Sequence, residues 1–105
     1  MQQQACLDYA MSDLPDAVLT RQACAGEQQA FEMLVRRYQI PLFNFIYRFV
    51  GDYDQACDIS QEVFLRLYLS LSRLEVDKPL KPWLFQVAHN RCIDEIRRKQ
   101  RRATD

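Results

Sequence analysis

The stretch 79-PLKPWLFQVAHNRCIDEIRRKQRR-102 decides the fold that we expect, because its residues recur with the period of one long helix. On a helical wheel of about 100° per residue, the apolar side chains gather on one side. They are Leu84, Phe85, Ala88, Cys92 and Ile96. The other side carries an aromatic ring, amides and guanidinium groups, from Trp83, Gln86, Asn90, Arg97 and Arg101. The first side predicts packing in a core. The second suits nucleic acid, since Arg neutralises phosphate, Gln and Asn pair with base edges, and Trp stacks on unpaired bases.

Length and composition indicate a single helical domain. The chain has 105 residues, of which 49% are hydrophobic and 27% charged, as in globular proteins. Glycine is scarce, with 2 residues, and no segment alternates polar and apolar residues as a half-buried strand does. We therefore expect an all-α fold, a compact bundle of about four helices over residues 12–105, preceded by a polar segment at residues 1–11.

Charge is distributed unevenly along a chain whose net charge is zero. Residues 91–102 contain six basic and two acidic side chains, whereas residues 52–62 contain four acidic and no basic ones. This asymmetry predicts two partners of opposite charge.

Several patterns that would indicate other functions are missing from the sequence. The four cysteines form no CxxC motif and His89 is the only histidine, which argues against a disulfide framework or a metal site and favours a reducing compartment. No apolar run approaches about 18 residues and no signal peptide is recognisable, so we expect a cytoplasmic protein without membrane insertion. There is no glycine-rich loop and no spacing typical of a Ser/His/Asp triplet, so we expect neither enzyme activity nor a cofactor.

Capping residues and helix breakers divide the chain into helices. The first is expected to begin near residues 12–15 and to end at Gly26 in a left-handed cap. The second should run over residues 27–51, and Pro41 should kink or break it just before the proline. The aromatic residues of this second helix follow the helical period, so we assign them to the core rather than to a ligand site.

A third helix is expected from Asp52 or Asp54 to about Ser72, with two faces of different character. Its apolar stripe is Ala56, Ile59, Val63, Leu67 and Leu71. The opposite face carries acids, an amide and leucines, from Asp58, Gln61, Glu62, Leu65 and Leu69. Leucines on the side away from the core predict a partner surface. The alternative is a solvated face with two incidental leucines, because single exposed leucines are common.

The fourth helix leaves alternatives open for two residues. Pro79 and Pro82 place Trp83 in its first turn, where the ring would either contact nucleic acid or cap the core at the helix junction. His89 lies at the edge of the polar side, either as a DNA contact or as a partly buried helix histidine. The arginines near the end of this helix suit phosphate, because their side chains are long and mobile there. They are Arg97, Arg98 and Arg101.

Three segments carry a family resemblance: AFEMLVRRYQIPLF (30–43), DISQEVFLRLY (58–68) and PWLFQVAHNRCIDEIRR (82–98). In this order and spacing they are similar to the opening helix, the acidic polymerase-binding helix and the promoter-reading helix of region 2 in bacterial extracytoplasmic-function (ECF) sigma factors. The resemblance covers about residues 14–102. It implies a compact bundle of mostly antiparallel helices.

The resemblance implies a surface for core RNA polymerase on the third helix. This surface would dock on the coiled coil of the polymerase β′ subunit. Its residues are Asp58, Gln61, Glu62 and Leu65. Family analogy adds an anti-sigma protein that competes for one or both binding surfaces.

The resemblance also implies that the fourth helix and the loop before it open and read the promoter −10 element. A base of the non-template strand would be flipped into a protein pocket. Asn90 matches a position near that pocket, and Trp83, Gln86 and His89 match positions close to the melting junction.

The sequence departs from the family pattern at two places. The loop RLEVDK (73–78) lacks the Arg-Gly-Asp-like pattern that is common before the promoter-reading helix, so the resemblance leaves the shape of the flipped-base pocket open. No helix-turn-helix of the family's region 4 follows the basic stretch. We therefore expect either a fragment of a longer sigma factor or a stand-alone region 2 protein.

Taken together, these patterns predict a region 2 domain of an alternative sigma factor, which binds core polymerase and recognises and melts the −10 element to direct transcription initiation. The alternative is a helical protein-interaction module without specific DNA binding, whose leucine and acid face binds one protein and whose basic tail only adds solubility. Salt-dependent, sequence-selective binding of single-stranded DNA would separate the two.

Overall fold

A computed structural model describes residues 13–104, so the polar segment predicted at residues 1–11 lies outside the described residues. The described part consists of helices α2 (Asp16–Cys24), α3 (Gln28–Val50), α4 (Tyr53–Ser70) and α5 (Leu80–Thr104), and it contains no strand. The predicted all-α class is confirmed.

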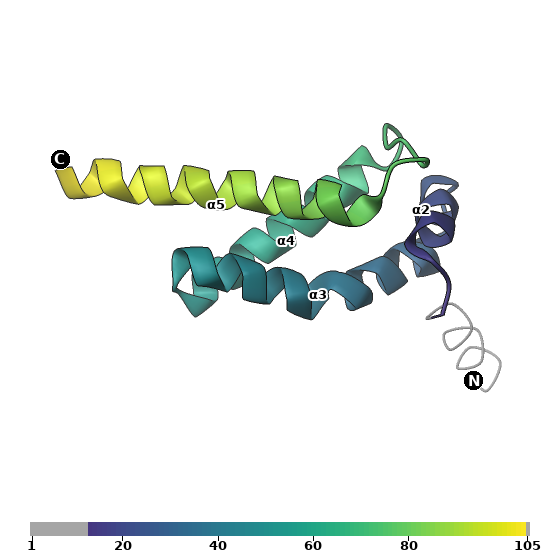
Figure 1. The fold of residues 1–105 in the computed structure, drawn as a ribbon, viewed down its shortest axis with the longest axis horizontal. Coiled ribbons are helices and arrows are strands. Elements are labelled where there is room, and N and C mark those ends of the chain that lie inside the picture. The colour runs from purple at the N-terminus through teal and green to yellow at the C-terminus, as the bar shows by residue number, and fades with distance from the viewer. Residues whose placement is uncertain (1–12, 105) are drawn as a thin grey trace.

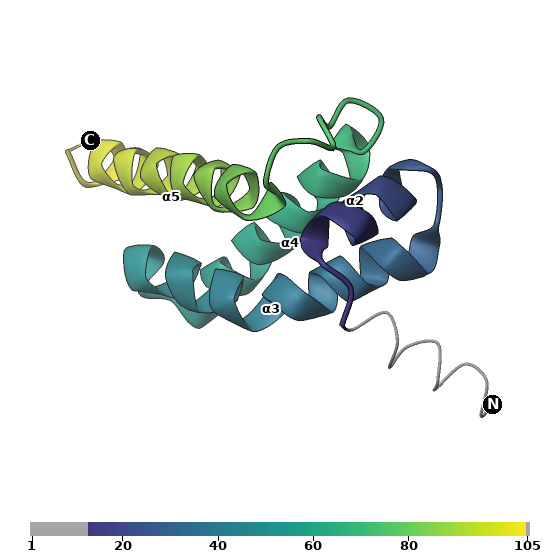
Figure 2. The ribbon, with the colours of Figure 1, turned by 45° about the vertical axis from the view of Figure 1, so that its right-hand side comes forward.

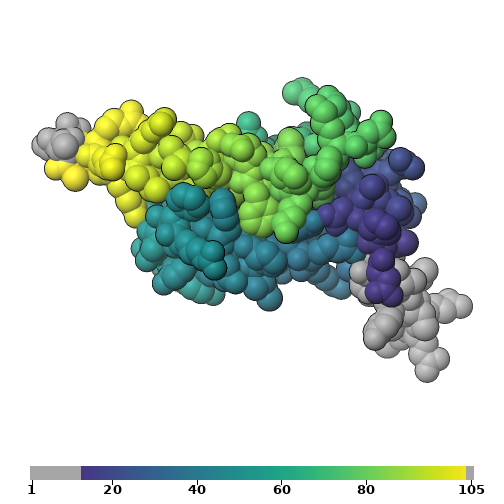
Figure 3. Space-filling view, in the orientation of Figure 1, coloured from purple at the N-terminus to yellow at the C-terminus, as the bar shows by residue number. Residues whose placement is uncertain are grey.

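Helices α3, α4 and α5 pack against one another, and α2 crosses the end of the bundle near the start of α5 (Figure 1). A turned view shows the same arrangement, with α4 behind the gap between α3 and α5 (Figure 2). The last turns of α5 extend beyond the other helices, and the molecule is elongated, with extents of 56 × 28 × 17 Å (Figure 3). The basic end of α5 therefore has solvent on most sides.

The helix boundaries lie close to the predicted ones because local capping determines them. After α2, Gly26 adopts a positive φ of 99°, and the backbone N–H of Glu27 bonds to the carbonyl of Gln22, as in a Schellman cap. Gly51 ends α3 in the left-handed conformation. Asp52 caps α4, since its side chain accepts a hydrogen bond from the Gln55 N–H at 3.0 Å.

Pro41 was expected to kink or break α3, and the predicted break is wrong. The helix continues from Gln28 to Val50 with Pro41 inside it. A proline in a helix interior costs about 3 kcal/mol. Tyr38 and Leu42 on either side of it are buried, and each large apolar side chain contributes about 1.5–3 kcal/mol when buried. Packing on both sides of the proline therefore outweighs the missing hydrogen bond.

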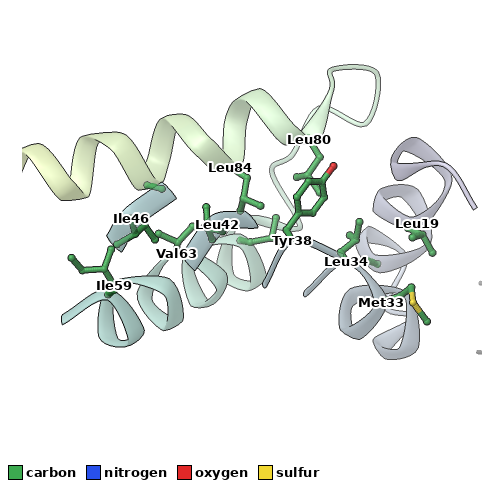
Figure 4. Packing of buried hydrophobic residues seen from close by; sticks show 14 of the residues in the cluster. Leu19, Met33, Leu34, Tyr38, Leu42, Ile46, Ile59, Val63, Leu80 and Leu84 are labelled. Atoms are coloured by element: carbon green, nitrogen blue, oxygen red, sulfur yellow. The ribbon is translucent and has the colours of Figure 1, made fainter. Parts of the chain in front are cut away.

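One hydrophobic core joins all four described helices (Figure 4). The predicted stripes are buried at their centres, including Leu67 on α4 and Leu84, Ala88 and Cys92 on α5. Leu71 and Ile96 are only half-buried. Leu71 follows the last residue of α4, and Ile96 lies in the C-terminal half of α5, the helix whose last turns extend beyond the others.

Polar contacts attach α2 to α3. Arg37 forms an ion pair with Asp16 at 2.6 Å, and the Tyr38 hydroxyl donates a hydrogen bond to the other oxygen of the same carboxylate. Burial raises the pKa of Tyr38, and the neighbouring Asp16 raises it further. The phenol therefore remains a hydrogen-bond donor at neutral pH.

Candidate functional site

The outer face of α4 has the orientation that the helical period predicts. Asp58, Gln61, Glu62 and Leu65 are all exposed, and 58% of Leu65 is accessible to solvent. The stripe on the opposite side is buried in the core. These four residues therefore share one accessible face, as a docking surface requires.

An apolar groove between α3 and α4 extends this face. Its walls include exposed Ile40, Tyr53 and Tyr68 as well as Leu65. Ring contacts pair Phe43 with Tyr53 and Phe31 with Tyr68, each with centroids 5.3 Å apart. The aromatic residues of α3 were predicted to lie in the core as a group, which is correct for buried Tyr38 and wrong for Tyr47, which is exposed. Ile40 lies on the side of its helix opposite the apolar stripe, and this position was the sequence signal for an outer apolar surface.

The polar side of α5 presents a hydrogen-bonded pair of amides. Gln86 and Asn90 are exposed, and Gln86 Nε2 donates to Asn90 Oδ1 at 2.9 Å. This bond uses one acceptor of Asn90 and one donor of Gln86, so the Asn90 NH₂ and the Gln86 carbonyl can bond to an external ligand. The pair forms a pre-oriented donor and acceptor edge of the kind that discriminates bases.

The sequence left two alternatives open for Trp83 and for His89, and both residues are half-buried. Trp83 packs against the core at the start of α5 and also lines a pocket of about 360 Å³, formed with the 73–79 loop and Thr20 of α2. The His89 ring lies edge-to-face against Phe49, with centroids 5.5 Å apart. Each ring is thus held in place by packing and keeps part of its surface accessible.

The arginines predicted to bind phosphate are exposed, and so is Arg102. The predicted ones are Arg97, Arg98 and Arg101. Arg101 and Arg102 lie in the last turn of α5, and the last turns of this helix extend beyond the bundle (Figure 3). Cations at a helix C-terminus also interact favourably with the helix dipole. The structure therefore separates the amide and indole groups near the start of α5 from the guanidinium groups at its end.

A polar network that the sequence patterns did not predict joins α4 to α5. Arg91 donates from Nε to Glu62 at 2.7 Å and from Nη1 to Glu95 at 3.2 Å. Glu95 is buried and also accepts a hydrogen bond from Gln55 at 2.9 Å. The hydrogen bond to Glu62 is the main cause that raises the pKa of Arg91. The spacing of Arg91 and Glu95, four residues apart on one helix, was the only sequence signal for this network.

Two further features bear on function within residues 13–104. No described helix is both long enough and apolar enough to cross a membrane. Nor do the described residues include a group of three or more His, Cys, Asp or Glu side chains that could hold a metal ion.

Comparisons with known proteins identify the family. The model of sigma-70 region 2 matches residues 34–102. The ECF RNA polymerase sigma factor SigW of Bacillus subtilis (strain 168) is 34% identical over 80 residues, which are 76% of this chain and 43% of SigW.

Solved structures agree with the sequence match. An engineered region 2 of sigmaE, determined by NMR in complex with GTAAAA, has a TM-score of 0.75 at 31% identity, covering 85% of this chain and 93% of that one. CnrH in complex with the cytosolic domain of CnrY has a TM-score of 0.72 at 30% identity, covering 75% of this chain and 51% of CnrH.

The chain spans less than half the length of SigW and about half that of CnrH. The region 2 match nevertheless takes in most of α3 and the whole of α4, and it ends at residue 102 of α5. The predicted resemblance is confirmed: the chain belongs to the sigma-70 region 2 family, and its relatives are ECF RNA polymerase sigma factors.

Proposed function

We propose that this chain acts as an alternative sigma factor domain that binds core RNA polymerase and recognises and melts the promoter −10 element, directing transcription initiation. One observation carries the proposal. The fold matches region 2 of sigmaE in complex with GTAAAA over 93% of that domain, and the α5 of this chain has an exposed face of amides and guanidinium groups. The sequence GTAAAA contains thymine, so that ligand is DNA.

The DNA-binding roles divide along α5. Asn90 and Trp83 act on unpaired bases, because the amide has both a donor and an acceptor and the indole offers a stacking surface. The pocket beside Trp83 is lined in part by the 73–79 loop and receives a flipped base, whereas Asn90 is not among its lining residues and contacts the strand farther along α5. Stacking contributes about 1–3 kcal/mol per base, which offsets an unpairing cost of a few kcal/mol. Gln86 and His89 lie at the edge of the melted segment.

Phosphate binding belongs to the last turns of α5. The side chains that supply it are Arg97, Arg98 and Arg101. A guanidinium group is always charged and pairs with phosphate oxygens through paired N–H donors, but it carries no sequence information in such a contact. These residues position the strand, and the amide and indole groups read it.

The outer face of α4 binds the coiled coil of the polymerase β′ subunit. Asp58, Gln61 and Glu62 provide hydrogen-bond acceptors and negative charge, and Leu65 provides apolar surface that continues into the α3–α4 groove. An interface with a buried apolar centre and a polar rim is common among protein complexes. The polymerase catalyses RNA synthesis, and this domain directs it to the promoter.

A regulatory protein of the anti-sigma class is a further proposed partner. CnrH, which shares the fold, was solved in complex with the cytosolic domain of CnrY. The α3–α4 groove of this chain offers an accessible apolar surface next to the proposed polymerase face, so a protein bound there would compete with polymerase.

A selection experiment tests the proposed function. The chain is mixed with bacterial core polymerase and a pool of single strands that carry a randomised six-base segment, and the retained strands are sequenced. We expect a consensus, and binding of the consensus strand at least about 5-fold tighter than of a scrambled strand of the same composition. Retention that falls with salt but shows no sequence preference would favour the interaction-module alternative. The matched control omits the chain.

A further inference from the structure

Arg91 connects the two helices to which we assign different partners. It stands on α5, between Gln86 and the terminal arginines, yet its guanidinium group bonds to carboxylates rather than lying open on the DNA face. Its Nε donates to Glu62 of α4 at 2.7 Å, and its Nη1 donates to Glu95 at 3.2 Å. Glu62 is one of the four residues of the proposed polymerase face.

The network runs from a buried end to an exposed end. The Glu95 side chain is 8% exposed, the Arg91 side chain 31% and the Glu62 side chain 52%. A buried carboxylate is costly unless it is paired, and Glu95 has two donors, Arg91 and Gln55. Glu95 therefore fixes the position of the Arg91 guanidinium group, and Arg91 in turn restrains the exposed carboxylate of Glu62.

We propose that Arg91 is a positioning residue of the polymerase interface, which holds the Glu62 carboxylate in the orientation in which core polymerase binds it. This inference rests on the proposed function and assigns to the polymerase side a residue that belongs to the DNA-binding helix. The ion pair occupies Glu62 Oε2 only, so the second carboxylate oxygen can accept a hydrogen bond from polymerase while the pair persists.

Arg91 should raise the affinity for core polymerase because it orients the Glu62 side chain before polymerase binds. A long exposed side chain that becomes fixed at an interface loses rotamer freedom, and the hydrogen bond to Arg91 restricts the Glu62 side chain before polymerase binds. The expected contribution corresponds to about 2- to 10-fold in affinity for core polymerase. The competing assignment is a phosphate contact by Arg91, which would use the Nη2 donors that its two bonds to carboxylates leave open. The salt dependence of DNA binding distinguishes this assignment from positioning of Glu62.

A double-mutant cycle on the full chain tests the proposal. The variants are Arg91→Met, Glu62→Ala and the pair, and the measurement is the dissociation constant for core polymerase. Arg91→Met should weaken binding about 2- to 10-fold in the wild-type background and should have no further effect in the Glu62→Ala background, where the acceptor of the Arg91 hydrogen bond is gone. Lys99→Met removes an exposed cation from the same helix and serves as the matched control, with unchanged polymerase affinity.

Two further measurements separate positioning from a structural or a DNA role. Thermal melting of each variant shows whether it is folded at the assay temperature. Arg91→Lys keeps the charge that Glu95 needs, so it should recover part of the lost affinity, and it replaces Arg91→Met in the cycle if that variant is unfolded. The salt dependence of binding to single-stranded DNA should be the same in Arg91→Met as in the wild type.

Three outcomes would overturn the inference while leaving the proposed function intact. They are an unchanged polymerase affinity in Arg91→Met, an equal loss in both backgrounds of the cycle, and a DNA salt slope reduced by about one unit, which marks a phosphate contact. If the wild-type chain itself does not bind core polymerase, the proposed function fails and this inference fails with it.

Discussion

Two leucines on α4, two residues apart, provide a matched test of how this helix is oriented. Leu67 is fully buried in the core, whereas 58% of Leu65 is exposed on the opposite face. Leu67→Ala leaves a cavity in a packed core and should cost about 2–5 kcal/mol of unfolding free energy, out of the roughly 5–15 kcal/mol that a small domain has. Leu65→Ala makes the same chemical change at the surface, where the cost is usually below about 0.5 kcal/mol.

Thermal unfolding followed by circular dichroism measures the difference. A loss of 1 kcal/mol lowers the melting temperature of a domain of this size by about 4–8 °C, so Leu67→Ala should melt at least about 8 °C below the wild type and Leu65→Ala close to it. The effects on polymerase binding should be in the opposite order when both variants are folded. Leu65→Ala should weaken retention of core polymerase more than Leu67→Ala does. Similar melting temperatures for the two variants would refute the assignment of the core and outer faces of α4.

The remaining predictions concern the DNA face, α2 and a buried thiol. Arg101→Ala should weaken binding to all single strands alike and reduce the salt slope by up to about one unit, whereas Asn90→Ala should keep the slope and lose about 1–3 kcal/mol of discrimination between the selected and scrambled strands, both measured with core polymerase present. Full discrimination by Asn90→Ala would remove its base-reading role. Asp16→Ala breaks the ion pair with Arg37 and should cost about 1–3 kcal/mol, with hydrogen exchange of α2 amides accelerated more than that of α4; equal protection of α2 would contradict the anchoring role. Burial raises the pKa of Cys92 from 9.0 to about 11, so the folded state retains a proton that the unfolded state loses, and stability falls as pH rises from about 9 to about 11. Chemical denaturation across that range should show a steeper fall in the wild type than in Cys92→Ala, and parallel curves would refute the cause.

Proline and glycine show how far local rules extend in this chain. Gly26 and Gly51 end helices as expected, because a left-handed cap depends on the residue itself and its immediate neighbours. Pro41 was expected to kink or break α3 on the same kind of local argument, and the helix continues through it. Tyr38 and Leu42, on either side of the proline, are buried in a core built from all four described helices, and a local rule does not include the stabilisation from that burial.

The sequence by itself determined which faces of α4 and α5 are buried, because an apolar stripe at the helical period can be satisfied only by turning toward a core. It therefore placed Leu65 and Asn90 outside and Leu67 inside, in agreement with the structure. Only the tertiary structure decided what lies between helices: the apolar groove beside Ile40, the half-burial of Trp83, and the Arg91 contact with Glu62, 29 residues away along the chain. Such pairs depend on the distance and rotation between two packed helices, and these follow from the packing of the whole core rather than from the period of either helix.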